Sequence, residues 1–307
     1  MKILLTVFAI SCLLVPGIRA ENIEIPKTSS KQFDDYWYPR GAEISKFSLE
    51  QSRYGEIHSG DAVQIFVTEP LNPNLQVKAD NKRPGNIPIL KLNFTRKFFT
   101  GVYPYSIMTS VFAPIRSDLH PLPLKISFTS QEWCGHVFMQ LNLREAGYQV
   151  QHRSYFEKES DREFTVDRLL TEDGLWTLIR ISPQSLPQGT FKLLPSATFV
   201  RLMHKPFKSA SATGTLTTTW RNSLEGNDLL KYQVQIEETG RVLEFWFEKK
   251  FPHRIQEWKE TGTPLSHFGN KALTTRAVRT HTIMTDYWSK NKNQHRPMLK
   301  DLGLKPN

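Results

Sequence analysis

Apolar and polar residues alternate along much of the chain. The clearest alternating runs are residues 63–67, 90–94, 124–128, 137–143, 148–150 and 230–236. A period of two predicts β-strands with one buried face and one face in water. Parallel sheets instead show continuous apolar runs, so the alternation favours antiparallel pairing. We therefore expect an all-β (β-rich) fold: a large curved antiparallel sheet, or half-barrel, with one or two short helices.

The C-terminal third shows the clearest turn signals. Glu238-Thr239-Gly240 separates two alternating runs, as expected of a hairpin loop with glycine at a positive φ. Pro252 ends the second run, a third begins at Arg254, and residues 272–282 are rich in threonine. These features predict a four-stranded meander.

Helical patterns are few. Thr165 is a candidate N-cap for a helix that carries Leu169, Trp176 and Ile179 on one side, although Gly174 interrupts it. Residues 287–302 are predicted to form a short terminal helix. The Ser/Thr/Ala-rich residues 209–219 are interpreted as a linker or an edge strand, and they give the best candidate for a domain boundary.

The N-terminus has the pattern of a signal peptide. Lys2 precedes an apolar run over residues 3–15, followed by Pro16-Gly17 and a small residue, Ala20. The run is shorter than the roughly 20 apolar residues that span a bilayer. We expect an exported protein, periplasmic or secreted. The alternative is a lipoprotein signal with acylated Cys12, which would anchor the chain to a membrane.

These signals give a domain scheme. It comprises a signal peptide (1–20), a flexible leader (21–35), an antiparallel β domain (36–208), and a C-terminal β meander with a short helix (209–307) that either continues the preceding sheet or forms a separate unit. No later segment has enough uninterrupted apolar residues to be a transmembrane helix.

Charge and cysteine content narrow the chemistry. Removing residues 1–20 takes away Lys2 and Arg19 and no acidic residue, so the net charge falls from +10 to +8. Such a surface favours anionic partners such as lipid headgroups or acidic glycans, while the scattered charges do not indicate a nucleic-acid face. The mature chain would keep only Cys134, which excludes an internal disulfide.

The densest local chemistry is Glu132-Trp133-Cys134-Gly135-His136. Cys134 and His136 would share a strand face, which suggests a nucleophile with its base; His152 or a carboxylate is an alternative base. A buried structural cysteine is the competing interpretation. Candidate carboxylates near turns or strand ends, two of which a glycoside hydrolase would need, are Glu43, Glu56, Asp61, Glu69 and Glu132.

Known cofactor motifs are absent from the sequence. It has no nucleophile elbow, phosphate-binding loop or dinucleotide fingerprint, and its histidines lack zinc-protease spacing. We expect neither a cofactor nor a metal.

Aromatic residues beside turns suggest a binding surface. The predicted ligand-binding residues are Trp37, Tyr38, Arg40, Tyr103, Tyr105 and Trp133. Such rings line apolar cavities or stack on sugars, although strands also favour aromatics for core packing. The preferred hypothesis is a non-enzymatic module for a lipophilic or glycan ligand; the alternatives are an enzyme using Cys134 and a structural partner of another envelope protein.

Several phrases of the sequence resemble a family of bacterial envelope proteins. They are residues 36–44 (YWYPRGAEI), 53–69, 103–112, Trp133-Cys134-Gly135 and 151–157. Members often carry the label "septum formation inhibitor Maf". Maf nucleotide pyrophosphatases are cytoplasmic α/β proteins with a Ser-Pro-Arg-Arg motif that this chain lacks, so no catalytic residue is transferred. The resemblance implies an exported β protein.

Overall fold

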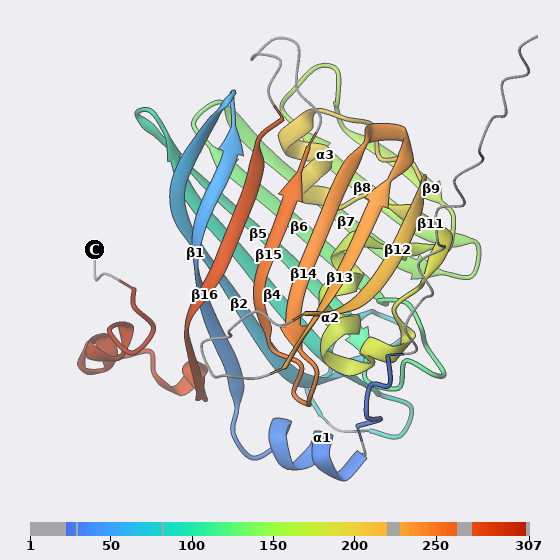
Figure 1. Ribbon diagram of the computed structural model, residues 1–307, viewed down its shortest axis with the longest axis vertical. Coiled ribbons are helices and arrows are strands. Elements are labelled where there is room, and N and C mark those ends of the chain that lie inside the picture. The colour runs from blue at the N-terminus through green and yellow to red at the C-terminus, as the bar shows by residue number, and fades with distance from the viewer. Residues whose placement is uncertain (1–22, 29, 82, 220–227, 263–271, 305–307) are drawn as a thin grey trace, which may run out of the picture.

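One sheet of 16 strands dominates the structure (Figure 1). The computed structural model describes residues 23–28, 30–81, 83–219, 228–262 and 272–304. The strand order is β10-β11-β12-β13-β14-β15-β16-β1-β2-β4-β5-β6-β7-β8-β9, with β3 paired to β2 beside this path. All pairs are antiparallel except β10 with β11. The expected β-rich class with a large curved antiparallel sheet is therefore confirmed, and the sheet is open.

The strands are β1 (Ala42–Arg53), β2 (Glu56–Asn72), β3 (Val77–Lys78), β4 (Ile87–Thr100), β5 (Tyr103–Pro114), β6 (Lys125–Glu132), β7 (Gly135–Arg144), β8 (Gly147–Ser154), β9 (Arg162–Val166), β10 (Leu170–Thr171), β11 (Gly189–Leu194), β12 (Ala210–Thr219), β13 (Leu229–Ile236), β14 (Arg241–Glu248), β15 (Ile255–Thr261) and β16 (Thr274–Thr285). The helices are α1 (Ser30–Trp37), α2 (Glu172–Ile181) and α3 (Ala197–Met203), and the short 3₁₀ helices are η1 (Pro183–Ser185), η2 (Glu237–Thr239), η4 (Tyr287–Ser289) and η5 (Asn293–Leu299).

Helix α2 lies on the concave side of the sheet and fills its centre (Figure 1). Thr171 caps it by accepting a hydrogen bond from the Gly174 N–H. Residues 172–180 of the helix are all buried, against β4 and β5 and also against Pro123 of the β5–β6 connection. Trp176 contacts Phe94 of β4, Phe245 of β14 and Trp258 of β15 at ring-centroid distances of 4.9, 4.7 and 5.6 Å. Strands from both halves of the sheet, β4 in one and β14 and β15 in the other, therefore share one core.

Helices α1 and α3 lie at opposite ends of the strands, α1 at the bottom and α3 at the top of Figure 1. Helix α1 buries Phe33, Tyr36 and Trp37. Helix α3 is capped by Ser196, whose hydroxyl accepts from the Phe199 N–H, and its first amide, at Ala197, donates to Asp173 of α2. The two ends are called the α1 end and the α3 end below.

A separate apolar cluster lies away from α2. Leu302, which follows η5, is buried there with Ala42 and Ile44 of β1 and Val67 of β2. The η4–η5 arm, residues 286–304, therefore packs against β1 and β2 through Leu302 near its end. Figure 1 shows this arm in red, continuing from the end of β16.

Local predictions at turns and linkers gave mixed results. The Glu238–Gly240 turn is present, with Gly240 at φ +60°, and β13 to β16 form the meander. The expected linker or edge strand at 209–219 is instead β12, paired on both sides with β11 and β13. Threonine-rich sequence suits a strand interior, and pairing partners cannot be read from it.

The helix predictions need correction. Thr165 lies in β9, and the cap of the helix that contains Trp176 is Thr171. Part of the expected flexible leader forms α1, and residues 287–302 form 3₁₀ turns.

The strands of the two proposed β domains belong to one sheet. The expected signal peptide, including Cys12, lies outside the described residues. Within the described residues, no helix is both long enough and apolar enough to cross a bilayer.

Candidate functional site

An open cavity of about 990 Å³ lies at the α1 end. We call it the α1 recess. The segment joining α1 to β1 forms one wall with Tyr38 and Arg40, and the η4–η5 arm contributes Trp288; Arg83 and Asn86 from the β3–β4 connection also line it. Tyr38 and Trp288 are 52% and 53% exposed. This volume and mixed lining are typical of a small-molecule site.

The register of β1 with β16 builds the recess. Ala42 is opposite Thr285, so the residues just before β1 and just after β16 emerge side by side. Gly41 makes the turn at φ +83°, and a Cβ at this position would lie 2.8 Å from the Thr285 backbone. The close approach therefore requires glycine, and it places Tyr38 and Arg40 at the same cavity as Trp288.

The charges of the recess are unequally compensated. The carboxylate of Glu69 is 3.2 Å from the Lys78 amine and 2.9 Å from the Lys91 amine, and Asp286 is 3.3 Å from Lys290. Within the described part of the chain, Arg40 and Arg83 form no ion pair. The two exposed guanidinium groups are thus available to an anion.

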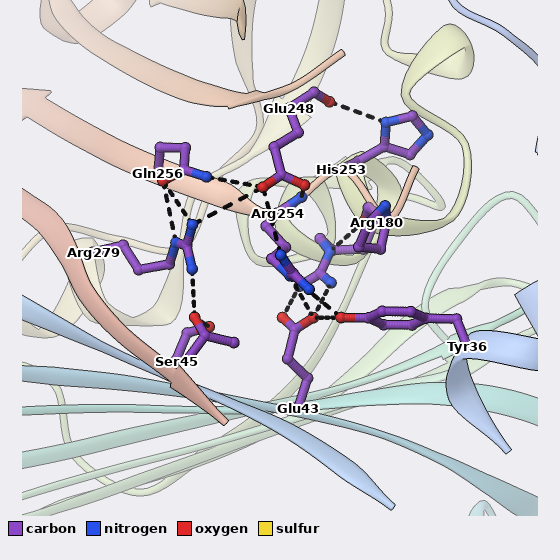
Figure 2. A network of polar contacts seen from close by, with 11 residues as sticks. Tyr36, Glu43, Ser45, Arg180, Glu248, His253, Arg254, Gln256 and Arg279 are labelled. Atoms are coloured by element: carbon purple, nitrogen blue, oxygen red, sulfur yellow. Dashed lines mark hydrogen bonds and ion pairs between the residues drawn. The ribbon is translucent and has the colours of Figure 1, made fainter. Parts of the chain in front are cut away.

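Figure 2 shows a buried ionic network that includes Tyr36 of α1 and Glu43 of β1. Both carboxylate oxygens of Glu43 in β1 accept from Arg180 of α2, at 2.6 and 2.8 Å, and one also accepts from the Tyr36 hydroxyl. Burial alone would raise the pKa of Glu43, but Arg180, Tyr36 and Arg254 outweigh it and lower the pKa. The guanidinium carbon of Arg180 also lies 5.2 Å from the centre of the Trp37 ring. The network therefore supports a residue that lines the recess.

The same network continues into the meander. Arg279 of β16 donates to the side-chain Oε1 of Gln256 at 2.9 Å, and the Gln256 Nε2 donates to the Glu248 carboxylate at 3.0 Å. Burial lowers the pKa of His253 to about 4, and its Nδ1 lies 3.1 Å from the Glu248 carbonyl oxygen. These groups are satisfied by one another and line none of the cavities described here. We interpret them as structural.

The predicted ligand-binding residues divide between the two ends. Trp37, Tyr38 and Arg40 lie together at the α1 recess. Tyr103, Tyr105 and Trp133 lie at the α3 end, where the Trp133 ring stacks on Tyr103 with a centroid distance of 6.3 Å. Tyr105 is buried, whereas Trp133 is 73% exposed at a hairpin tip. The six residues therefore do not form one site.

A tyrosine cluster lies beneath Trp133 at the α3 end. The Tyr54 hydroxyl is 2.9 Å from that of Tyr105 and 3.3 Å from that of Tyr103, and Arg53 donates to Tyr54 at 3.1 Å. Burial raises the pKa of Tyr54, but these hydrogen bonds and the Arg53 charge outweigh it and lower the pKa. The hydroxyl and guanidinium groups of this cluster mainly satisfy one another's hydrogen bonds.

The environment of Cys134 does not activate its thiol. Cys134 is exposed at the β6–β7 turn, and its backbone N–H donates to Glu132 at 2.6 Å. Hydrogen bonding to Glu132 raises the pKa of the thiol, with smaller contributions from burial and the Glu132 charge. His136 is exposed, and His152 is buried on β8, where desolvation lowers its pKa. Among the described residues, no hydrogen bond joins the Cys134 sulfur to either histidine.

Four of the five candidate carboxylates already have cationic partners. Besides Glu43 and Glu69, Asp61 lies 2.9 Å from Lys46, and Glu132 lies 2.9 Å from Arg201. Glu56 is exposed. Within the described ranges, no three His, Cys, Asp or Glu side chains are grouped to hold a metal ion.

Sequence reasoning missed Trp288, Arg83 and Asn86 as recess residues. Trp288 follows a strand and Arg83-Pro84-Gly85-Asn86 reads as a turn, which are weak signals of a loop site. Their approach to Tyr38 depends on long-range strand pairing.

Searches of protein-family models, curated proteins and solved structures gave no significant match to this chain.

Proposed function

We propose that the protein is a non-enzymatic binding module whose α1 recess takes an acidic saccharide. The observation that carries this proposal is the combination, in one open cavity, of the half-exposed rings of Tyr38 and Trp288 with the unpaired guanidinium groups of Arg40 and Arg83. Aromatic faces stack on sugar rings, and guanidinium groups pair with carboxylates in bidentate geometry.

A saccharide suits this geometry better than an acyl chain. In a half-barrel lipid carrier the concave face would shelter the lipid, but here α2 occupies that face and is buried throughout. The recess is open, and its paired carboxylates and Asn86 provide acceptors and donors that hydroxyl groups can use. The proposed export of the chain would bring it to acidic polysaccharides outside the cytoplasm.

The test is isothermal titration of the purified protein with tetragalacturonate and with maltotetraose, a neutral tetrasaccharide. We expect saturable binding of tetragalacturonate, at least tenfold tighter than that of maltotetraose. Arg40→Ala and Arg83→Ala should each weaken tetragalacturonate binding roughly tenfold, because a charged hydrogen bond contributes about 1.5–3 kcal/mol. Tyr38→Ala and Trp288→Ala should weaken both sugars.

Matched controls lie elsewhere on the surface. Trp133→Ala removes an even more exposed indole from the α3 end, and Arg116→Ala removes an exposed arginine paired with Asp118. Both variants should bind like the parent protein. Absence of tetragalacturonate binding, or loss in the controls as large as in the recess variants, would refute the proposal. Binding of dodecyl maltoside in the recess, without either sugar, would assign it to a lipophilic ligand.

A further inference from the structure

A second cavity, of about 250 Å³, lies at the α3 end, far along the strands from the α1 recess. We call it the α3 cavity. It lies between α3, the start of β12 and the β13–β14 hairpin, and Phe199, Ala210 and Ile236 contribute apolar wall. Two prolines, Pro195 and Pro206, flank α3 and restrict the backbone of the wall.

An ion pair forms a fixed polar part of the wall. Arg241 of β14 donates at 3.0 Å to one carboxylate oxygen of Glu172 and also to the other, and its guanidinium carbon lies 3.8 Å from the centre of the Phe199 ring. Both side chains are at least 96% buried. Because Glu172 compensates the charge of Arg241, this pair orders the cavity but adds little net charge.

Lysines provide the uncompensated charge. Lys205 and Lys208 line the cavity, are exposed, and form no side-chain ion pair within the described part of the chain. The third charge at the rim is Glu238, whose two carboxylate oxygens accept from the Ser211 backbone N–H at 2.8 and 2.9 Å. The cavity thus has apolar walls and a cationic rim.

We propose that the α3 cavity binds a small aliphatic carboxylate, with the carboxylate at Lys205 and Lys208 and the chain against Phe199 and Ala210. Ligand sites of this kind bury an apolar body and orient it with a few charged groups at the opening. The volume limits the ligand to a short chain, since drug-sized ligands occupy about 300–1,000 Å³. This site is independent of the saccharide site in residues, position and ligand.

The test is titration of isotope-labelled protein with hexanoate and with hexan-1-ol, followed by amide chemical shifts. Hexanoate should shift signals of β12 and the β13–β14 hairpin saturably, with an affinity at least tenfold above that of hexan-1-ol. The double variant Lys205→Ala/Lys208→Ala should bind hexanoate roughly tenfold more weakly and leave hexan-1-ol unchanged, since about 1.4 kcal/mol corresponds to tenfold. Lys249→Ala/Lys250→Ala, at the β14–β15 turn, is the matched control and should bind like the parent.

A cavity-filling variant tests the location separately. Ala210→Phe should abolish binding of both probes, because the larger ring occupies the space of the ligand chain. Equal affinity for hexanoate and hexan-1-ol, unsaturable shifts, or hexanoate binding undiminished in the lysine double variant would overturn the proposal. If Ala210→Phe fails to fold, the lysine pair and its control still decide the outcome.

Discussion

The two ends of the sheet are held in the same way but present different surfaces. At each end a helical arginine pairs with a buried strand glutamate: Arg180 with Glu43 at the α1 end, and Arg201 with Glu132 at the α3 end. At the α1 end, the η4–η5 arm lies opposite Tyr38 and creates a recess. At the α3 end, Trp133 and Tyr155 protrude from hairpin tips, 73% and 81% exposed. The exposed aromatic rings thus face a cavity at the α1 end, where a second segment lies opposite them, and protrude from hairpin tips at the α3 end.

The largest expected effect comes from breaking the pair at the α1 end. Arg180→Met leaves the Glu43 carboxylate buried without its main partner, and such losses cost about 3–5 kcal/mol. Urea unfolding followed by tryptophan fluorescence measures this. Because Arg180 also packs on Trp37, tetragalacturonate binding should weaken as well.

The corresponding variant at the α3 end sharpens the comparison. Arg201→Met should destabilise the protein similarly but leave tetragalacturonate affinity at its parent value, measured where both variants are folded. The double variant Arg180→Met/Glu43→Gln should recover part of the lost stability, because it leaves no unpaired charge. An equal loss of affinity in both single variants would contradict the distinction between the ends.

The next largest expected effect is a pH dependence of the unfolding free energy, caused by Asp173 where α2 meets α3. Burial raises the pKa of Asp173 to about 7, although the Ala197 N–H donates to its carboxylate at 3.0 Å and opposes the shift. The folded state therefore holds a proton that the unfolded state releases near pH 4. The contribution of Asp173 to the unfolding free energy should fall by a few kcal/mol as pH rises from about 4 to 7.

The Asp173→Asn variant isolates that contribution. Unfolding free energies at pH 5 and pH 8 should differ less for the variant than for the parent protein, and the variant should be the more stable of the two at pH 8. The control is Asp118→Asn: the Arg116 hydrogen bond lowers the pKa of this exposed carboxyl to about 2, so it stays ionised over the range. A parental pH slope in Asp173→Asn would show that Asp173 is ionised in the fold.

The smallest effect concerns the thiol at the α3 end. Because Glu132 raises the pKa of Cys134, alkylation by iodoacetamide at pH 7 should be several-fold slower than that of an unstructured cysteine peptide, despite exposure. Mass spectrometry follows the reaction, with urea-unfolded protein as the reference. Alkylation faster than the peptide would instead support the alternative of a Cys134 nucleophile.

Local patterns predicted the strands well, because alternation reports directly which side chains face the core. Residues 230–236 alternate and form β13, with Leu230, Tyr232, Val234 and Ile236 buried. Helix α2 was harder to predict from the sequence. Because it is buried on all sides, it lacks the polar face that marks a surface helix. The sequence pattern predicts a start at Thr165, but this residue pairs with Gln149 of β8 as part of β9, and the helix is capped by Thr171.

The candidate site was only half predictable. Tyr38 and Arg40 were found because an aromatic group beside Pro39 and Gly41 indicates a shaped turn. Tyr103, Tyr105 and Trp133, also in the predicted ligand set, lie at the α3 end, since β1 carries the chain from one end of the sheet to the other. The partner that completes the recess, Trp288, is about 250 positions away in sequence, and no local rule connects it to Tyr38.

The pairing of β1 with β16 has a consequence for connectivity. Strands β1 to β9 follow one another across one wing, and β10 to β16 follow one another across the other. If β16 were linked directly to β1 and the chain opened between β9 and β10, strand order would equal chain order throughout. Apart from β3 and the parallel pair β10–β11, the fold thus has the order of a circularly permuted up-and-down meander. The central pair of the sheet, β1 with β16, joins the strands that are farthest apart in sequence, with Ala42 opposite Thr285. During synthesis, strands β1 to β9 therefore emerge first. Their concave face forms before α2 and strands β10 to β16 exist to cover it.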